Sequence, residues 1–176
     1  MILTGQEIIK QVHLGRIKIN PFNMDQINPN SYNFRLGNKI KYYVNSVLDT
    51  KVKQKVEEVE IDSHGYTLYP GKIYLGHTLE NMGSDHYVPI VKGRSSTARL
   101  GLFIHVTADI IDVGSYNQWT LQLYAVQPIK IYSEMLIGQV TFWTIYGDIK
   151  LYNGKYQGSQ GPCESLIYKD FIEDLK

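Results

Sequence analysis

Short runs of β-branched and aromatic residues, separated by turn signals, recur through most of the chain and predict a mainly β structure. Six of these runs have the length and composition of strands. They are Lys39–Ser46, Thr67–Leu75, Tyr87–Val91, Phe103–Thr107, Trp119–Val126 and Ile137–Tyr146. Several short strands of this kind, with few helical stretches between them, favour a sandwich or barrel with peripheral helices.

The N-terminus carries the clearest helix signal. Thr4 and Glu7 have the spacing of a capping box, in which each side chain bonds the other residue's backbone N–H. Ile8 and Val12 then fall on one helical face, and Gly15 suits the position just after the helix. We expect one short amphipathic helix here.

Two further stretches have helical character. Arg94–Leu100 is the first, and the last dozen residues are the second, with Ile167, Phe171 and Leu175 forming an apolar stripe at a spacing of four. The stripe is typical of a helix that packs on its own domain or on a neighbouring subunit. The charge-dense run Lys51–Glu60 carries both signs and interspersed valines, which indicates a solvated strand or hairpin.

Length and charge limit the class of protein. A chain of 176 residues without repeats or linkers suits a single domain covering residues 1–176. The formal net charge of +1 gives no field that would attract nucleic acid or an anionic membrane. Phosphate binding must therefore come from a few placed residues, which favours a small anionic ligand over a polymer.

Cysteine and hydropathy exclude other classes. The single cysteine, Cys163, cannot form an intramolecular disulfide or a multi-cysteine zinc site. Neither a signal peptide nor an apolar run of about 20 residues is present, so we expect a cytoplasmic protein. Pro162-Cys163 lacks the second thiolate of a zinc deaminase, and His77 and Glu80 lack the spacing of a helical zinc motif.

The segment Lys92–Gly101 has the strongest chemical signal. It places two guanidinium groups, Arg94 and Arg99, and two hydroxyls, Ser95 and Ser96, within six residues at the start of a short helical pattern. Guanidinium forks, hydroxyls and free N–H groups at a helix start all suit phosphate oxygens. A surface turn whose arginines pair with carboxylates is the alternative.

The sequence around this segment resembles the dCTP deaminase family of the dCTP deaminase/dUTPase superfamily. Gly93–Leu102 reads G-R-S-S-T-A-R-L-G-L, and H-V-T-A, I-D-V-G and T-L-Q follow it in family order and spacing. Three more segments, Asn30–Gly37, Ser133–Phe142 and Lys155–Pro162, resemble the family's motifs toward both ends. The likeness covers nearly the whole chain.

The resemblance implies a distorted, dUTPase-like β-barrel with a few peripheral helices, assembled as a homotrimer. Each active site would lie at a subunit interface and be closed by a C-terminal tail of about residues 150–176. The family deaminates dCTP to dUTP without zinc, and some members also hydrolyse the triphosphate to dUMP. Magnesium would enter with the triphosphate, since it dehydrates reluctantly and seldom occupies an all-protein cage.

The resemblance also implies a role for individual residues. The nucleotide phosphates would be bound by the turn that comprises Arg94, Ser95, Ser96, Thr97, Ala98 and Arg99, with Ser95 and Arg99 also positioning water. Asp112 would bind the sugar hydroxyl, and the backbone of Thr120 and Leu121 would meet the pyrimidine edge. Tyr152 and Lys155 would close over the phosphates, with Ser159 or Gln160 in the place of the family's tail glutamine.

Some of these residues have ordinary structural interpretations. Asp112 could cap a turn, and Tyr152 could be a packed strand-end aromatic. His105, flanked by Ile104 and Val106, is expected to be a hydrogen-bonded core residue.

Gln122 stands where the family has its catalytic glutamate, the group that takes a proton from water and delivers it to ammonia. An amide has no useful basicity at neutral pH, so deamination should be impaired. An engineered inactivation, a natural loss of deamination and a nucleotide sensor all remain open. The departures from the family pattern at Ile110, Val113 and 115–117 favour natural divergence. The sequence thus predicts binding of dCTP, dUTP or dTTP, with a dUTP diphosphohydrolase or a non-catalytic regulator as alternatives.

Overall fold

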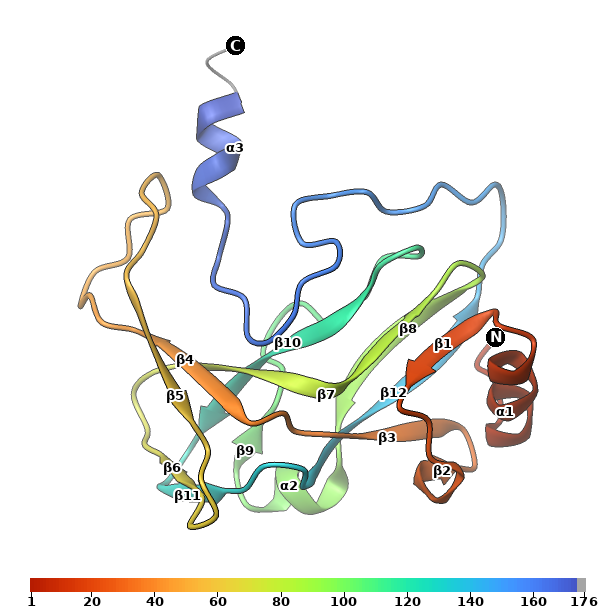
Figure 1. Ribbon diagram of the computed structural model, residues 1–176, viewed down its shortest axis with the longest axis horizontal. Helices are drawn as coiled ribbons and strands as arrows, with labels where there is room; N and C mark the ends of the chain where they lie inside the picture. The colour runs from red at the N-terminus through yellow and green to blue at the C-terminus, as the bar shows by residue number, and fades with distance from the viewer. Residues whose placement is uncertain (174–176) are drawn as a thin grey trace.

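The computed structural model describes residues 1–173, and its strands form two main antiparallel sheets with short helices at the periphery (Figure 1). The larger sheet has the order β5-β4-β7-β10-β9, with one further strand, β1, paired to β7. Its strands are β1 (Ile17–Asn20), β4 (Lys39–Tyr43), β5 (Val56–Glu60), β7 (Tyr74–Ser84), β9 (Leu102–Phe103) and β10 (Tyr116–Ala125).

A smaller sheet, in the order β2-β3-β12-β8, lies beside the first. It contains β2 (Ile27–Asn28), β3 (Ser31–Arg35), β8 (Tyr87–Gly93) and β12 (Leu136–Thr144), while β6 (Tyr66–Leu68) and β11 (Ile129–Ile131) form a separate pair. The sheets do not close into one ring, although a bridge between Leu36 and Thr78 connects them. The mainly β, distorted barrel expected from the sequence is therefore confirmed.

The core is built from inward-facing residues of both sheets. Tyr32 and Phe34 on β3, Met82 on β7, Leu121 on β10 and Phe142 on β12 are all fully buried. Along β10 buried and half-buried residues alternate without interruption. Because successive side chains of a strand point to opposite faces, this strand has one face in the core and the other free for a site.

The N-terminal helix matches its prediction. Helix α1 (Gly5–His13) begins after Thr4, whose hydroxyl accepts a hydrogen bond from the Glu7 N–H, and Gly15 follows it at φ 69°. The Glu7 carboxylate, however, accepts from Gln11 Nε2 at 2.5 Å. The other helices are short: η1 (Met24–Gln26), α2 (Ser95–Arg99) and α3 (Tyr168–Glu173). None of the helices in residues 1–173 is long and apolar enough to cross a bilayer.

Two of the predicted strands differ from those observed. The run Thr67–Leu75 is not one strand, because Gly71 at φ 92° turns the chain between β6 and β7. Of the run Phe103–Thr107, only Phe103 belongs to a strand, because β9 pairs with β10 only through Leu102 and Phe103. The next residues follow an irregular path, and that path contributes to the candidate site.

The predicted tail helix is present as α3, which projects beyond the sheets at the top of Figure 1. Two contacts attach it to the rest of the chain: Asp170 accepts a hydrogen bond from Lys155, and the Lys51 ammonium lies 5.6 Å from the Phe171 ring centroid. Ile167 and Phe171 of the apolar stripe remain partly exposed, and Leu175 lies outside the described residues.

Candidate active site

The outer face of β10 forms one wall of a cavity of about 700 Å³. Thr120 and Gln122 alternate with the buried Leu121 and Leu123, so the alternation that fills the core also directs the first pair to the other face. The irregular segment 105–112 forms a second wall through His105, Ala108 and Asp112, and the C-terminal tail forms the third.

Hydrogen bonds attach the tail to β10. The Gln118 N–H donates to the Ser159 carbonyl at 3.2 Å, and the Gly161 N–H donates to Gln118 Oε1 at 2.7 Å. Farther along, the Cys163 N–H donates to the Thr120 hydroxyl at 2.9 Å. The tail therefore runs across this strand, as the blue segment above β10 in Figure 1 shows, and its residues Tyr152, Tyr156 and Ser159 line the cavity.

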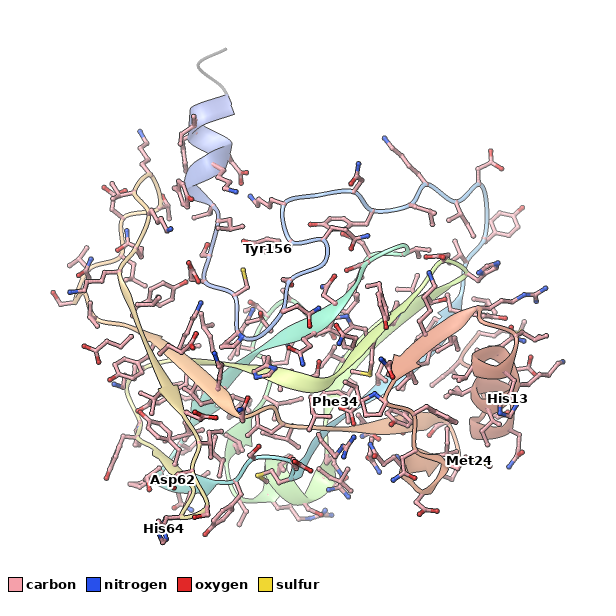
Figure 2. All side chains as sticks on the ribbon, viewed as in Figure 1. His13, Met24, Phe34, Asp62, His64 and Tyr156 are labelled. Carbon is pink, nitrogen blue, oxygen red and sulfur yellow. The ribbon has the colours of Figure 1, made fainter. Side chains whose placement is uncertain are left out.

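Tyr156 holds the shape of the tail. Its hydroxyl accepts a hydrogen bond from the Leu166 N–H at 2.9 Å, and its own N–H donates to the Tyr152 hydroxyl at 3.2 Å. Figure 2 labels Tyr156 between the two arms of this loop. The two tyrosines and Ser159 all line the cavity.

The structure brings five of the sequence-predicted site residues to one cavity. They are Asp112, Thr120, Gln122, Tyr152 and Ser159. The Asp112 side chain is exposed, and the turn that follows it is closed by the Asp112 carbonyl, which accepts from the Ser115 N–H at 3.1 Å. The turn is closed by the backbone and does not use the carboxylate.

The predicted phosphate turn lies outside this cavity. Helix α2 carries the exposed Ser95, Ser96 and Arg99, and Figure 1 shows the helix at the end of the molecule opposite the C-terminal tail. The Thr97 hydroxyl is buried and donates to the Arg94 carbonyl at 2.8 Å, and Arg94 Nη1 donates to the Leu136 carbonyl at 3.0 Å. The alternative of arginines paired with carboxylates fails, because neither arginine forms an ion pair within residues 1–173.

Apolar side chains are exposed beside the phosphate turn. Leu100, Phe103 and Val126 are each more than half exposed. They are neighbours, because the Val126 N–H donates to the Gly101 carbonyl at 3.0 Å and β9 pairs with the end of β10. Contiguous apolar surface of this kind is typical of a contact with another protein chain.

The remaining predicted residues do not line the cavity. Leu121 is in the core, Lys155 pairs with Asp170, and Gln160 Nε2 donates to Asn81 Oδ1 at 2.7 Å. Ala98 is exposed on α2 with its neighbours. Ser159 and Gln160 are the two candidates for the place of the tail glutamine. Of these two, Ser159 alone lines the cavity formed by the described residues.

The interpretation of His105 as a hydrogen-bonded core residue is wrong. The residue is half-buried outside any strand and lines the cavity, and neither ring nitrogen forms a hydrogen bond of good geometry among residues 1–173, although the Ala108 backbone lies close enough to act on the ring. Burial lowers the pKa of His105 below its ordinary value of 6.5, while the nearby Ala108 backbone and Asp109 act in the opposite direction. The imidazole is therefore neutral near pH 7.

Sequence reasoning also missed the far end of the cavity, which is lined by Tyr43, Lys72 and Glu164. The Lys72 ammonium lies 4.0 Å from the Tyr42 ring centroid, and a hydrogen bond from Lys41 lowers the pKa of Glu164. These residues come from strands and loops far apart in the chain. The sequence around each of these residues does not indicate that they share a site.

The chain is similar in sequence to proteins of one family. A family described as dCTP deaminase-like matches residues 2–145. A protein of Clostridium botulinum (strain Eklund 17B / Type B) named "dCTP deaminase, dUMP-forming" is 50% identical over 173 residues, which is 97% of this chain and 99% of that protein. A protein of the same name from Leptospira biflexa is 44% identical over 172 residues, covering 97% and 98% of the two chains.

The fold also matches a solved structure. The 2'-deoxycytidine 5'-triphosphate deaminase from Agrobacterium tumefaciens superposes with a TM-score of 0.62 at 23% identity, over 80% of this chain and 47% of that one. Since the family match spans most of the chain and its relatives align nearly end to end, the chain belongs to the dCTP deaminase family.

Proposed function

We propose that the protein binds a deoxypyrimidine triphosphate and carries out the family reaction on dCTP slowly. The main support is that Asp112, Thr120 and Gln122 line one cavity. The chain is also 50% identical, over 97% of its length, to a protein named "dCTP deaminase, dUMP-forming". Because those relatives are named dUMP-forming, the proposed products are ammonia, pyrophosphate and dUMP, with dUTP as the deaminated intermediate. We place the reaction in the cytoplasm, since a triphosphate does not cross a bilayer unaided.

The proposed site uses two protomers of a homotrimer. The base and sugar would enter the cavity, where the Asp112 carboxylate accepts from the sugar hydroxyl and the β10 backbone meets the pyrimidine. The phosphates would meet Arg94, Ser95, Ser96 and Arg99 of a neighbouring copy. Ser95, Ser96 and Arg99 are exposed, do not line the cavity of their own chain and lie beside the apolar surface of Leu100, Phe103 and Val126, which supports this division.

In this proposal, magnesium binds together with the triphosphate. The residues of the α2 turn offer two guanidinium groups and two hydroxyls, a donor set that suits phosphate oxygens rather than a bare cation. When bound, the ion would neutralise part of the phosphate charge. This chain's residues would bind and orient the nucleotide around it.

Gln122 gives the proposal its main functional consequence. Its carboxamide can pair with a pyrimidine's exocyclic group and ring nitrogen, so base recognition survives. It has no basicity with which to activate water. We therefore expect nucleotide binding to be retained and deamination to be slow.

The Gln122→Glu variant tests this directly. Restoring a carboxylate at this position should raise the rate of ammonia release from dCTP by about 10²–10⁴-fold, the usual contribution of a general acid–base group. Products are measured by chromatography after incubation with dCTP and magnesium. Gln127→Glu, the same chemical change at an exposed turn residue, is the matched control and should leave the rate unchanged.

Calorimetry with dCTP, dUTP and dTTP distinguishes the alternatives. Pyrophosphate release from dUTP without ammonia from dCTP would select a diphosphohydrolase. Tight binding with neither product would select a nucleotide-responsive regulator. If none of the three nucleotides binds, the proposal fails as a whole.

A further inference from the structure

The position of His105 beside residue 122 follows from strand pairing. Leu102 and Phe103 pair with the end of β10, and the Gln122 N–H extends the same ladder by donating to the Ile104 carbonyl at 3.1 Å. The residue that follows, His105, leaves the ladder and lines the same cavity as Gln122. One edge of β10 therefore fixes the imidazole next to the position from which the family's carboxylate is missing.

The imidazole has unused hydrogen-bonding capacity beside the cavity. Neither ring nitrogen forms a hydrogen bond of good geometry within residues 1–173, although the Ala108 backbone lies close enough to act on the ring and both nitrogens are shielded from solvent. The proposed role therefore requires the ring to turn toward the cavity when dCTP binds. The nearest charged groups are Lys92 on β8 and Asp109 in the segment that follows the histidine, and these two pair with each other. They line a second cavity of about 260 Å³, and His105 lines both cavities.

Other titratable groups of the large cavity are less suitable for accepting a proton. The Glu164 carboxylate is held by Lys41 at 2.9 Å, which lowers its pKa and its basicity. Burial raises the pKa of the Cys163 thiol, so it stays protonated near neutrality. Asp112 is exposed and occupied by the sugar in the proposed complex. Histidine is the side chain that gains and loses protons near pH 7.

We propose that His105 carries the proton in the slow deamination by this chain, a catalytic role that rests on the proposed function. The neutral imidazole takes a proton from water as the water oxygen bonds to C4 of cytosine. The imidazolium then gives that proton to the amino nitrogen, the C4–N bond breaks, and ammonia leaves. The sum is dCTP plus water to dUTP plus ammonia, with the imidazole returned to its neutral form.

His105→Asn and His105→Gly test the role of the ring. The rate of ammonia release should fall about 10²–10⁴-fold in both variants, while dCTP binding measured by calorimetry changes little. His64→Asn, at the exposed turn labelled in Figure 2, is the matched control and should keep the parent rate. Circular dichroism confirms that the variants are folded.

Chemical rescue separates proton transfer from a structural role. Imidazole added to His105→Gly should restore the rate in proportion to its concentration, and substituted imidazoles should restore it according to their basicity. A ring that only fills space would rescue without regard to basicity, and that result would overturn the proposal.

The pH profile gives a second test. Because only the neutral imidazole accepts a proton, and its pKa lies below 6.5, the rate should be constant above that value and fall as the pH drops through it. In Gln122→Glu the fall should move toward the ordinary carboxylate pKa of about 4.3.

The outcomes separate this inference from the function on which it rests. If no nucleotide binds, the proposed function fails. If dCTP binds but the parent protein releases no ammonia, or if His105→Asn deaminates as fast as the parent, the role of His105 is overturned while the binding proposal stands.

Discussion

Glu80 makes the most buried ionic contact in the described part of the chain, and its contribution can be measured. Its side chain is fully buried, and its carboxylate accepts from Arg35 Nε at 2.9 Å, from the Arg35 N–H at 2.9 Å and from Gln26 Nε2 at 3.2 Å. Removing one partner of such a pair leaves an uncompensated charge.

We expect Glu80→Ala to lower the free energy of unfolding by about 3 kcal/mol, the lower end of the range for buried pairs, because Arg35 keeps some contact with solvent. Urea denaturation at a fixed protein concentration measures the change. Lys39→Ala removes the exposed pair with Glu58 and should cost much less, because solvent screens an exposed pair. Equal losses in the two variants would contradict the argument.

The sequence predicts the location of some cavity residues and not of others. The roles of Asp112 and Gln122 stay predictions, but their meeting in one cavity could be expected because a family motif fixes their spacing. His105 could not be placed this way, since its environment depends on the pairing of Leu102 and Phe103 with β10. That pairing is not encoded in the residues around the histidine.

At the scale of elements, the alternating strand β10 was predicted, whereas β3, with buried polar residues, was missed. β10 alternates, as the sequence suggests, whereas β3 buries Ser31 and Asn33 beside its aromatic residues. The Ser31 hydroxyl donates to Gln139 Oε1 at 2.8 Å, and the Asn33 carbonyl accepts from Gln26 Nε2 at 2.6 Å. Buried polar groups need partners of this kind, and the partners come from distant segments.

The tail depends on β10 for its position, and Gln118 is the residue that tests this dependence. Its side chain accepts from the Gly161 N–H and donates to the Leu79 carbonyl at 2.9 Å. We expect Gln118→Leu to release the tail, so that trypsin cleaves at Lys155 several times faster while the sheets stay resistant. Limited proteolysis followed by mass spectrometry measures the rate. Gln127→Leu is the control, and equal cleavage in both variants would argue against an anchoring role.

The whole molecule presents its predicted nucleotide contacts on two separate surfaces. The cavity holds Asp112, Gln122 and Tyr152, while Arg94 and Arg99 belong to the α2 turn outside it. In the proposed complex, one triphosphate contacts the cavity of one copy and the α2 turn of the next. Two copies joined head to tail would bring the surfaces together, and three such contacts close a ring.

Mixing two inactive subunits tests this arrangement at the scale of the assembly. Arg99→Ala removes a phosphate contact and Asp112→Ala removes the sugar contact, so each variant alone should bind dCTP weakly. If each site takes its cavity from one copy and its arginines from the next, random mixing at equal amounts makes about a quarter of the interfaces intact. Calorimetry on the co-expressed mixture should then recover about that fraction of the parent's tight sites. A site contained within one copy would recover none, because every copy carries one of the two defects.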